Sequence, residues 1–325
     1  MRKFLVHAKT FERIEDALKP FADQISPLVL SDEGDLKQPW GESEAKAAIA
    51  YGTTDAYFSP AVMTFFTTLF EFEQLDWFQS SAAGTEHPMI QATGKKAALF
   101  SGSHEQSHAI AEWVLWAGLD HFQDGAARRR AQENQSWERL PFREISSTSW
   151  LIIGFGSIGQ ESGRRLRALG AHVTGVRRSG GSSEAANEIV TPDKMQAALR
   201  NADAVLLSVP LTDATENMAD AAFFEAMKSG SLFVNVGRGG LVDEAALLAA
   251  LDTGRLAQAS LDVVREEPLS PESEIWRHPQ ITLTPHIAAQ TPQSGLRTDK
   301  VFLTNLERFL AGKPLKNEVS ADVFS

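Results

Sequence analysis

The sequence contains no cysteine among its 325 residues. Disulfide bonds, catalytic thiolates and thiolate metal sites are therefore excluded. No run approaches the roughly 18 apolar residues of a membrane-spanning helix. The most apolar helical segment, residues 109–119, is interrupted by Glu112. The N-terminal stretch has only a short apolar run before charges resume, so we expect no signal peptide and a cytoplasmic location.

An excess of positive charge is also lacking. The chain carries 31 Lys and Arg against 42 Asp and Glu, which gives a formal net charge of −11. Nucleic acids and anionic membranes favour basic surfaces, so neither is expected as a partner. The local basic cluster at residues 128–130 follows a long helical pattern, and we interpret it as a helix end or a solvated arm. The ordinary apolar fraction of 43% and the length predict two domains with real cores.

A glycine-rich turn is the most informative motif that is present. The apolar run at residues 151–153 leads into Gly154-Phe155-Gly156-Ser157-Ile158-Gly159, and a helical pattern follows to Leu169. Strand, tight turn and helix form the context in which GxGxxG binds a dinucleotide. Gly154 would allow the turn, Gly156 the approach of a pyrophosphate, and Gly159 the packing of helix on strand. The helix N-terminus would offer N–H groups to the phosphates.

The end of the next predicted strand, residues 171–176, indicates which dinucleotide binds. NAD-specific sites usually have an acidic residue about 20 residues after the glycines. Here the residues are Arg177, Arg178 and Ser179. Guanidinium groups grip a 2′-phosphate with parallel hydrogen bonds, so NADP(H) is predicted, with weaker use of NAD(H). The alternative is a solvated basic turn that tolerates NAD.

Strand and helix patterns divide the chain into three blocks. Short strands alternate with helices up to about Ser101, and further buried strands alternate with helices from about Gly102 to Ala288. An amphipathic helix at residues 291–310 follows and is expected to complete the first block. Such alternation predicts α/β domains, the second with a doubly wound parallel sheet.

Three charged or titratable residues follow successive predicted strands of the second block. They are Arg238, Glu267 and His286. Taken singly, Arg238 is explained by a surface ion pair, Glu267 by a solvated loop carboxylate and His286 by a role as a helix cap. Ligands of open α/β sheets bind beyond the carboxyl ends of the strands, so together they suggest a site. Hydride transfer to a carbonyl needs a cation for the substrate and an acid that titrates near neutrality, and a carboxylate beside a histidine favours its protonated form.

Together with these residues, seven motifs in one order resemble the D-isomer-specific 2-hydroxyacid dehydrogenases, most of all their glyoxylate/hydroxypyruvate reductase branch. The motifs are AAG at residues 82–84, AIAEWVL at 109–115, LIIGFGSIG at 151–159, VPLTDAT at 209–215, NVGRGGLVDEAAL at 235–247, LDVVREEPL at 261–269 and TPHIAAQT at 284–291. The resemblance implies two Rossmann-like domains. A nucleotide domain, residues 102–288, would be inserted into a smaller flavodoxin-like substrate domain, residues 1–101 and 289–325.

The resemblance also implies the roles of residues. Arg238, Glu267 and His286 would be the catalytic triad, and Ala83 and Gly84 would bind the substrate with Arg238 and His286. The cofactor-binding set would be Gly154, Gly156, Ser157, Ile158, Gly159, Arg177, Arg178, Ser179, Val209, Pro210, Thr215, Val236, Gly237 and Asp262. A homodimer through the nucleotide domain is expected, with Trp137 in a position from which it can reach toward the partner's active site. No metal is expected.

Two departures from the family pattern put the preferred substrate in question. Ala289-Gln290 stands where many members have a glycine, often followed by Ser or Ala, after His-Ile-Ala, and Glu86 stands where Asp is more usual. Glyoxylate and hydroxypyruvate are the first choices by resemblance. Aromatic residues of the first domain (Trp40, Tyr57, Phe58 and Trp77) leave open a larger keto acid such as phenylpyruvate. A nucleotide-sensing interaction protein on the same fold is the alternative from another class.

One segment also matches the sequence motif of zinc proteases. His104-Glu105-Gln106-Ser107-His108 matches HExxH, and on a helix the two histidines would lie one turn apart on one face. A catalytic zinc needs a third protein ligand, and no HxxGxxH extension follows. We interpret the match as accidental and the segment as a polar helix entry.

Overall fold

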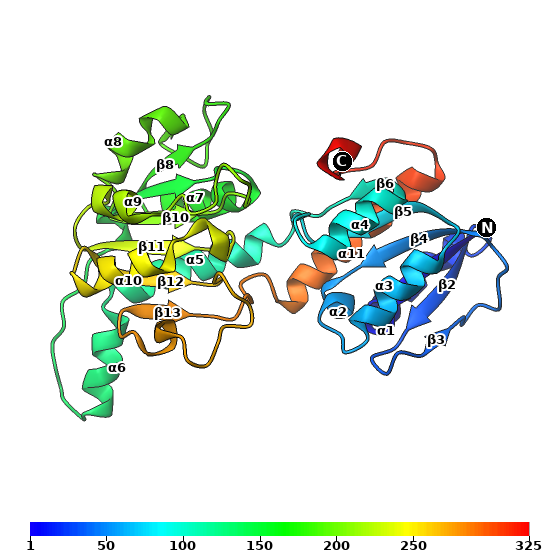
Figure 1. The fold of residues 1–325 in the computed structure, drawn as a ribbon, viewed down its shortest axis with the longest axis horizontal. Helices are drawn as coiled ribbons and strands as arrows, with labels where there is room; N and C mark the ends of the chain where they lie inside the picture. Colours follow the sequence, from blue (N-terminus) through cyan, green and yellow to red (C-terminus); the bar gives the residue numbers. More distant parts are fainter. Residues whose placement is uncertain (325) are drawn as a thin grey trace. The chain divides into compact units, whose positions relative to one another are not determined.

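Two compact units make up the chain in a computed structural model that describes residues 1–324 (Figure 1). The first contains Met1–Gln106 and the chain from Gln290 onward, and the second contains Ser107–Ala289. The chain thus leaves the first unit once and returns to it. Among the described residues, no helix has the length and apolar character needed to cross a membrane.

The first unit is built on a six-stranded sheet. Its strand order is β3-β2-β1-β4-β5-β6, and all neighbours are parallel except β2 and β3. Without the antiparallel edge strand β3, this is the order of a flavodoxin-like fold. The strands are β1 (Arg2–His7), β2 (Ile25–Leu30), β3 (Leu36–Lys37), β4 (Ala47–Gly52), β5 (Gln74–Ser80) and β6 (Ala97–Ser101).

Helices and aromatic residues complete the core of the first unit. Phe302 is fully buried and stacks on Tyr51 and Trp77, with ring centroids 4.3 and 5.4 Å away. Phe302 lies on the C-terminal helix, so the returning segment is part of this core. The helices are α1 (Ala8–Leu18), α2 (Thr54–Tyr57), α3 (Val62–Glu71), α4 (Pro88–Lys96) and α11 (Pro292–Leu310), with 3₁₀ turns η1 (Lys19–Phe21) and η6 (Ala321–Phe324).

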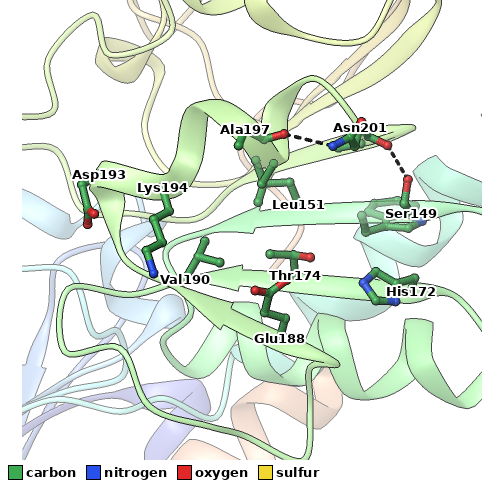
Figure 2. A pocket seen from close by; sticks show the side chains of 13 residues that line it. Ser149, Leu151, His172, Thr174, Glu188, Val190, Asp193, Lys194, Ala197 and Asn201 are labelled. Carbon is green, nitrogen blue, oxygen red and sulfur yellow. Dashed lines mark hydrogen bonds between the residues drawn. The ribbon is translucent and has the colours of Figure 1, made fainter.

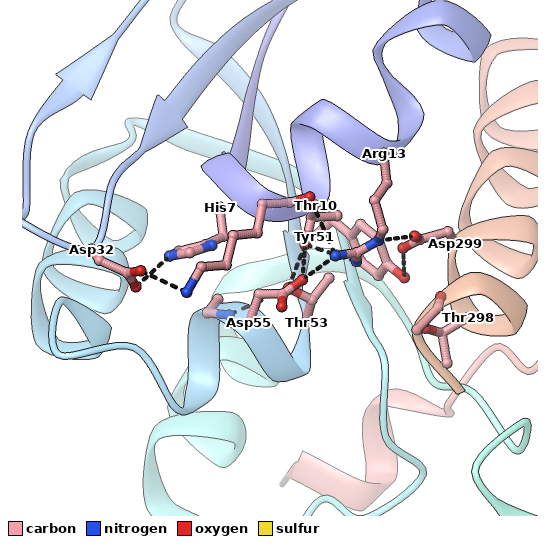
Figure 3. A network of polar contacts seen from close by, with 12 residues as sticks. His7, Thr10, Arg13, Asp32, Tyr51, Thr53, Asp55, Thr298 and Asp299 are labelled. Atoms are coloured by element: carbon pink, nitrogen blue, oxygen red, sulfur yellow. Dashed lines mark hydrogen bonds and ion pairs between the residues drawn. The ribbon is translucent and has the colours of Figure 1, made fainter. Parts of the chain in front are cut away.

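A polar network also fastens α11 to the rest of the first unit (Figure 3). Arg13 of α1 donates from Nε to Asp299 of α11 at 2.8 Å and from Nη1 to Asp55 of α2 at 2.7 Å. The Tyr51 hydroxyl donates to the other Asp299 oxygen at 3.1 Å. Burial raises the pKa of Asp299, and the Arg13 guanidinium opposes that rise. One cation therefore joins three elements that are distant in sequence.

The second unit has a seven-stranded, fully parallel sheet. Its order is β13-β12-β11-β10-β7-β8-β9. Counted from β7, the first six strands follow the doubly wound order 3-2-1-4-5-6, and β13 extends the edge. The strands are β7 (Ser149–Ile153), β8 (His172–Val176), β9 (Glu188–Val190), β10 (Ala204–Leu207), β11 (Ser231–Asn235), β12 (Leu256–Leu261) and β13 (Ile281–Leu283).

Both faces of this sheet are covered. Leu151 and Ile153 of β7 join one buried cluster, whereas Trp150 and Ile152 join another, as the two-residue period of a strand requires. The helices are α5 (Ser107–Phe122), α6 (Gly125–Glu133), α7 (Ser157–Ala168), α8 (Met195–Leu199), α9 (Ala221–Ala226) and α10 (Glu244–Asp252). The 3₁₀ turns are η2 (Ile145–Ser147), η3 (Pro192–Lys194), η4 (Gly239–Leu241) and η5 (Glu274–Arg277).

The predicted fold class, two Rossmann-like α/β units, is confirmed by these topologies. No strand was predicted at β3 or β9, which are two and three residues long. Segments so short carry too few alternations to register as strands.

Candidate functional site

The glycine turn forms the predicted link between β7 and α7. Gly154 has φ of +95°, a left-handed conformation that residues with a side chain rarely adopt. A Cβ there would also lie 2.6 Å from the backbone of Ser208. At Gly159, a Cβ would lie 2.4 Å from the carbonyl oxygen of Gly154. Both glycines are therefore required by close packing.

Gly156 differs from its two neighbours. A Cβ at this position would meet no atom within 4 Å. The residue is exposed and directly precedes the first turn of α7, where Ser157 and Ile158 are half-buried. A backbone that is open to solvent at a helix N-terminus fits the phosphates of a dinucleotide.

The basic turn after β8 is folded on itself. Arg177 donates from Nε and Nη2 to the carbonyl oxygen of Gly180, at 3.0 and 2.6 Å. The Gly180 amide in turn donates to the Arg177 carbonyl at 3.0 Å. Arg178 and Ser179 are exposed. The turn therefore holds one guanidinium in a defined place and presents the other to solvent.

The loop after β10 is closed by a threonine. The Thr215 hydroxyl donates to the Pro210 carbonyl at 2.8 Å and accepts from the Thr212 amide at 2.8 Å. Val209 lies half-buried where this loop leaves the strand. The cofactor role predicted for Val209, Pro210 and Thr215 stays a prediction.

The turn after β11 carries Arg238. Asn235 is fully buried, accepts from the Gly237 amide at 3.0 Å and donates to the Arg238 carbonyl at 3.0 Å. Val236 and Gly237, both predicted to contact the cofactor, are buried in this turn. A Cβ on Gly239 would overlap the backbone of Val264, so the turn packs directly against the segment after β12.

His286 and Glu267 form a hydrogen-bonded pair. Nδ1 of His286 lies 2.8 Å from Oε2 of Glu267. The Val264 amide donates to the other carboxylate oxygen at 3.2 Å. Burial alone would raise the pKa of Glu267, but the hydrogen bond and charge of His286, the Val264 amide and the charge of Arg238 together lower it. His286 and Arg238, the other two residues of the predicted triad, thus both act on Glu267.

The loop that carries His286 is held by Asp262. His286 has φ of +55°, a conformation that costs a residue with a side chain about 1–3 kcal/mol unless its surroundings enforce it. Its amide donates to the Asp262 carbonyl at 2.7 Å. The Asp262 carboxylate, 3% exposed, accepts from Thr284, Ile287 and Ala288. These hydrogen bonds tie the carboxylate to the histidine loop.

The family model for the D-isomer specific 2-hydroxyacid dehydrogenase NAD binding domain matches residues 114–288. The match covers more than half of the chain and contains the glycine turn, Arg238, Glu267 and His286.

The chain belongs to this family.

Relatives agree with that placement. Glyoxylate/hydroxypyruvate reductase A of Salmonella choleraesuis is 32% identical over 220 residues, 67% of this chain and 68% of the relative. D-3-phosphoglycerate dehydrogenase 2, chloroplastic, of Arabidopsis thaliana is 38% identical over 202 residues, 60% of this chain but only 32% of the relative, so the chain spans about a third of it.

A solved structure matches the whole fold. It is the NADPH-dependent glyoxylate/hydroxypyruvate reductase of Sinorhizobium meliloti in complex with NADP and sulfate, with a TM-score of 0.76 and 26% identity. The alignment covers 100% of this chain and 99% of that chain. The predicted resemblance to the 2-hydroxyacid dehydrogenases and to their reductase branch is confirmed.

The predicted substrate loop of this family member belongs to the first unit. Ala83 and Gly84 follow β5, and Ala83 is exposed. The Ser81 amide donates to the Gly52 carbonyl at 2.8 Å, and the Ala82 amide donates to the Ser80 hydroxyl at 3.1 Å. The loop is therefore anchored at the carboxyl ends of β4 and β5.

The segment with the HExxH letters leads into a helix and does not lie wholly on it, which agrees with its interpretation as a polar helix entry. Helix α5 begins at Ser107, so His104 and Glu105 precede it. The Ser103 hydroxyl accepts from the Glu105 amide at 3.3 Å, and the Glu105 carbonyl accepts from Arg297 at 3.2 Å. These bonds keep the segment out of the helix. Within residues 1–324, no cluster of three or more potential ligands is placed to hold a metal ion.

A hollow of about 590 Å³ lies away from these residues, over β7, β8, β9 and α8 (Figure 2). Its lining includes none of the predicted site residues. Two of its polar side chains bond locally, because Ser149 donates to the Asn201 carbonyl and Asn201 donates to the Ala197 carbonyl. The volume of this hollow is not a reason to include it in the candidate site.

Proposed function

We propose that the chain is an NADP(H)-dependent reductase of small 2-keto acids, with glyoxylate and hydroxypyruvate as the first candidates. The second unit would hold the cofactor, and the first would contribute Ala83 and Gly84 to the substrate site. The observation that carries the proposal is the His286–Glu267 pair, 2.8 Å apart, with Arg238 near enough for its charge to lower the pKa of Glu267.

In this proposal His286 supplies the proton and Arg238 the positive charge. Glu267 engages Nδ1, which directs the proton on Nε2 toward the carbonyl oxygen of the substrate. The carboxylate of Glu267 stabilises the imidazolium until that proton is transferred. Arg238 binds the substrate carboxylate and polarises the carbonyl. A reduced nicotinamide, when bound, supplies the hydride to the keto carbon.

The residues around the glycine turn fit that cofactor. Open space at Gly156 leaves room for a pyrophosphate against the start of α7. Arg177, Arg178 and Ser179 replace the acidic residue that an NAD site would favour, and this supports a 2′-phosphate. The S. meliloti relative was solved with NADP, which agrees with the same choice.

The burial and packing of aromatic residues in the first unit support a small substrate. Trp77 is fully buried, stacks on Phe302 and donates to Ser101 at 2.9 Å, so it is not available to line a pocket. Trp40 packs on Phe11, with ring centroids 6.0 Å apart. Phe58 is 66% exposed and Tyr57 bonds to Ser80. The aromatic set that would favour a bulky keto acid is thereby reduced.

A homodimer through the second unit is also proposed. Trp137 is 96% exposed in the segment after α6. Tryptophan is enriched at protein–protein interfaces. Sedimentation of the purified protein tests this, and a monomer at micromolar concentration would oppose it.

The decisive experiment is a series of kcat/KM values over 2-keto acids of increasing size, measured with NADPH and with NADH. We expect the optimum at glyoxylate or hydroxypyruvate with NADPH. An optimum at phenylpyruvate would overturn the substrate choice but leave the family assignment intact. Cofactor binding without turnover of any keto acid would instead favour the nucleotide-sensing interaction protein.

A further inference from the structure

Arg265 lies in the segment between β12 and Glu267, and its side chain reaches the turn that carries Arg238. Nη2 of Arg265 donates to the carbonyl oxygens of Val242 and Gly240, at 3.0 and 3.3 Å. The η4 turn, which contains Gly240, begins directly after Arg238. Strands β11 and β12 are parallel neighbours, so one guanidinium joins the two loops that follow them.

The same guanidinium also bonds to the loop that follows β10. Nη2 donates to Oδ1 of Asn217, and Nη1 lies 3.5 Å from Oε1 of Glu216. The Asn217 amide donates to the Gly240 carbonyl at 2.9 Å. The side chain of Arg265 thus contacts segments that follow three adjacent strands, β10, β11 and β12. An arginine is suited to this task because it has five N–H donors in a rigid planar fork.

The backbone beside this side chain is fixed as well. The Arg265 amide donates to Oε1 of Glu244, at the start of α10, at 2.7 Å. A Cβ on Gly239 would lie 1.9 Å from the carbonyl group of Val264 and 2.3 Å from the Arg265 nitrogen, so the two segments are in direct backbone contact. The Val264 amide donates to Glu267 at 3.2 Å. The hydrogen bond that holds Glu267 therefore starts from backbone that is anchored at Arg265.

We propose that Arg265 is a positioning residue, which anchors residues 264–267 to the turn after β11 and so keeps the Glu267 carboxylate in place beside His286. The ion pair with Glu216 is 39% and 55% exposed and contributes little by itself, because solvent screens it. The bonds to backbone carbonyls define the position of the segment. The catalytic consequence rests on the proposed function, whereas the anchoring does not depend on activity.

Arg265→Met tests the proposal because it retains most of the aliphatic stem and removes every side-chain donor. Arg265→Lys is the second variant, since its ammonium keeps the charge but lacks the planar fork and should retain only part of the contacts. Arg255→Met is the matched control. Arg255 also donates to two backbone carbonyls, those of Phe224 and Glu225, but it directly precedes β12, at the opposite end of that strand from the Glu267 segment.

Hydrogen exchange followed by mass spectrometry tests the anchoring without activity. The amides of Asn217, Val264 and Arg265 are all hydrogen-bonded in this arrangement. Arg265→Met should speed exchange about tenfold in peptides covering residues 215–219 and 263–267, Arg265→Lys should speed it less, and Arg255→Met should change neither segment. Unchanged exchange in both Arg265 variants would refute the proposal even if the chain reduced no keto acid. Its failure is therefore distinguishable from failure of the proposed function.

Kinetics decides whether the anchoring serves Glu267. Arg265→Met should lower kcat for keto-acid reduction about tenfold and move the decline of reduction to lower pH, in the same direction as Glu267→Gln. Arg265→Lys should recover part of kcat, and Arg255→Met should leave both kcat and the pH profile unchanged.

Combining Arg265→Met with Glu267→Gln gives the sharpest result. The combined loss of kcat should be close to that of Glu267→Gln alone, because the effects of two residues that act through one group are not additive. A combined loss equal to the product of the two single losses would overturn the proposal, since Arg265 would then act independently of Glu267.

Discussion

Replacement of Glu267 by Gln should move the pH limit of keto-acid reduction to lower pH. The His286 Nδ1 to Glu267 Oε2 distance is 2.8 Å, and the pKa of Glu267 is lowered by the hydrogen bond and charge of His286 against the effect of burial. Coupling between two sites is reciprocal, so the carboxylate favours the imidazolium. The neutral amide in Glu267→Gln carries no charge to stabilise a protonated donor, so the reductive limb is expected at lower pH.

The size of the shift follows from the exposure of the pair. A hydrogen bond between charged groups contributes about 1.5–3 kcal/mol when protected, and an exposed ion pair about 0.2–1 kcal/mol. The side chains are 46% and 37% exposed, which places this pair between those limits. A coupling of about 1 kcal/mol corresponds to roughly 0.7 pH units, at 1.36 kcal/mol for each unit.

The assay is kcat for NADPH-dependent reduction from about pH 5 to 9, compared with oxidation of the hydroxy acid. Oxidation needs neutral imidazole, so its limb should move in the same direction while activity rises with pH. Glu266→Gln is the control, because Glu266 is the exposed neighbour of Glu267. If the limb stays in place, or if the control moves it equally, the pairing is not functional.

Two further predictions concern the cofactor and the stability of the second unit. The unchanged enzyme should prefer NADPH over NADH by at least about tenfold in kcat/KM, and Arg177→Asp should erase this preference mainly through KM. Arg130→Asp on α6 is the control. Equal kcat/KM for both cofactors in the unchanged enzyme would refute the prediction. Asp203 is 6% exposed and forms ion pairs with Arg143 at 2.8 Å and Lys228 at 2.5 Å. Burial would raise the pKa of Asp203, but these partners and Ser149 hold that pKa well below its usual range. The ionised Asp203 stabilises the folded state above the unfolded pKa of about 3.9, and this stabilisation is lost as pH falls below that value. Asp203→Asn should therefore lower the unfolding free energy by about 1–3 kcal/mol at pH 7 and by less at pH 3.5, as measured by urea titration. A pH-independent difference would contradict the ion-pair account.

The sequence predicts most of this fold because its signals are local. The glycine turn shows its strand and its helix within 20 residues, and the Thr291 cap with Pro292 marks the start of α11. Arg238, Glu267 and His286 are predicted to form a site because each follows a strand, and parallel strands end at one edge.

What the sequence does not reveal depends on contacts between distant segments. Asp262 meets Thr284 and Ala288 only once β12 and β13 are paired, so its role in the histidine loop has no local signature. Asn235 did offer a signal, as a polar residue that ends a buried strand.

The central claim is that His286 gives the proton in the reduction of a 2-keto acid. The most direct test is His286→Ala, with kcat for keto-acid reduction and the Kd for NADPH measured on the same preparation. The account predicts a loss in kcat of about 100-fold or more with a Kd within about threefold, because the side chain acts on the substrate and not on the bound nucleotide. Turnover near that of the unchanged enzyme would contradict it.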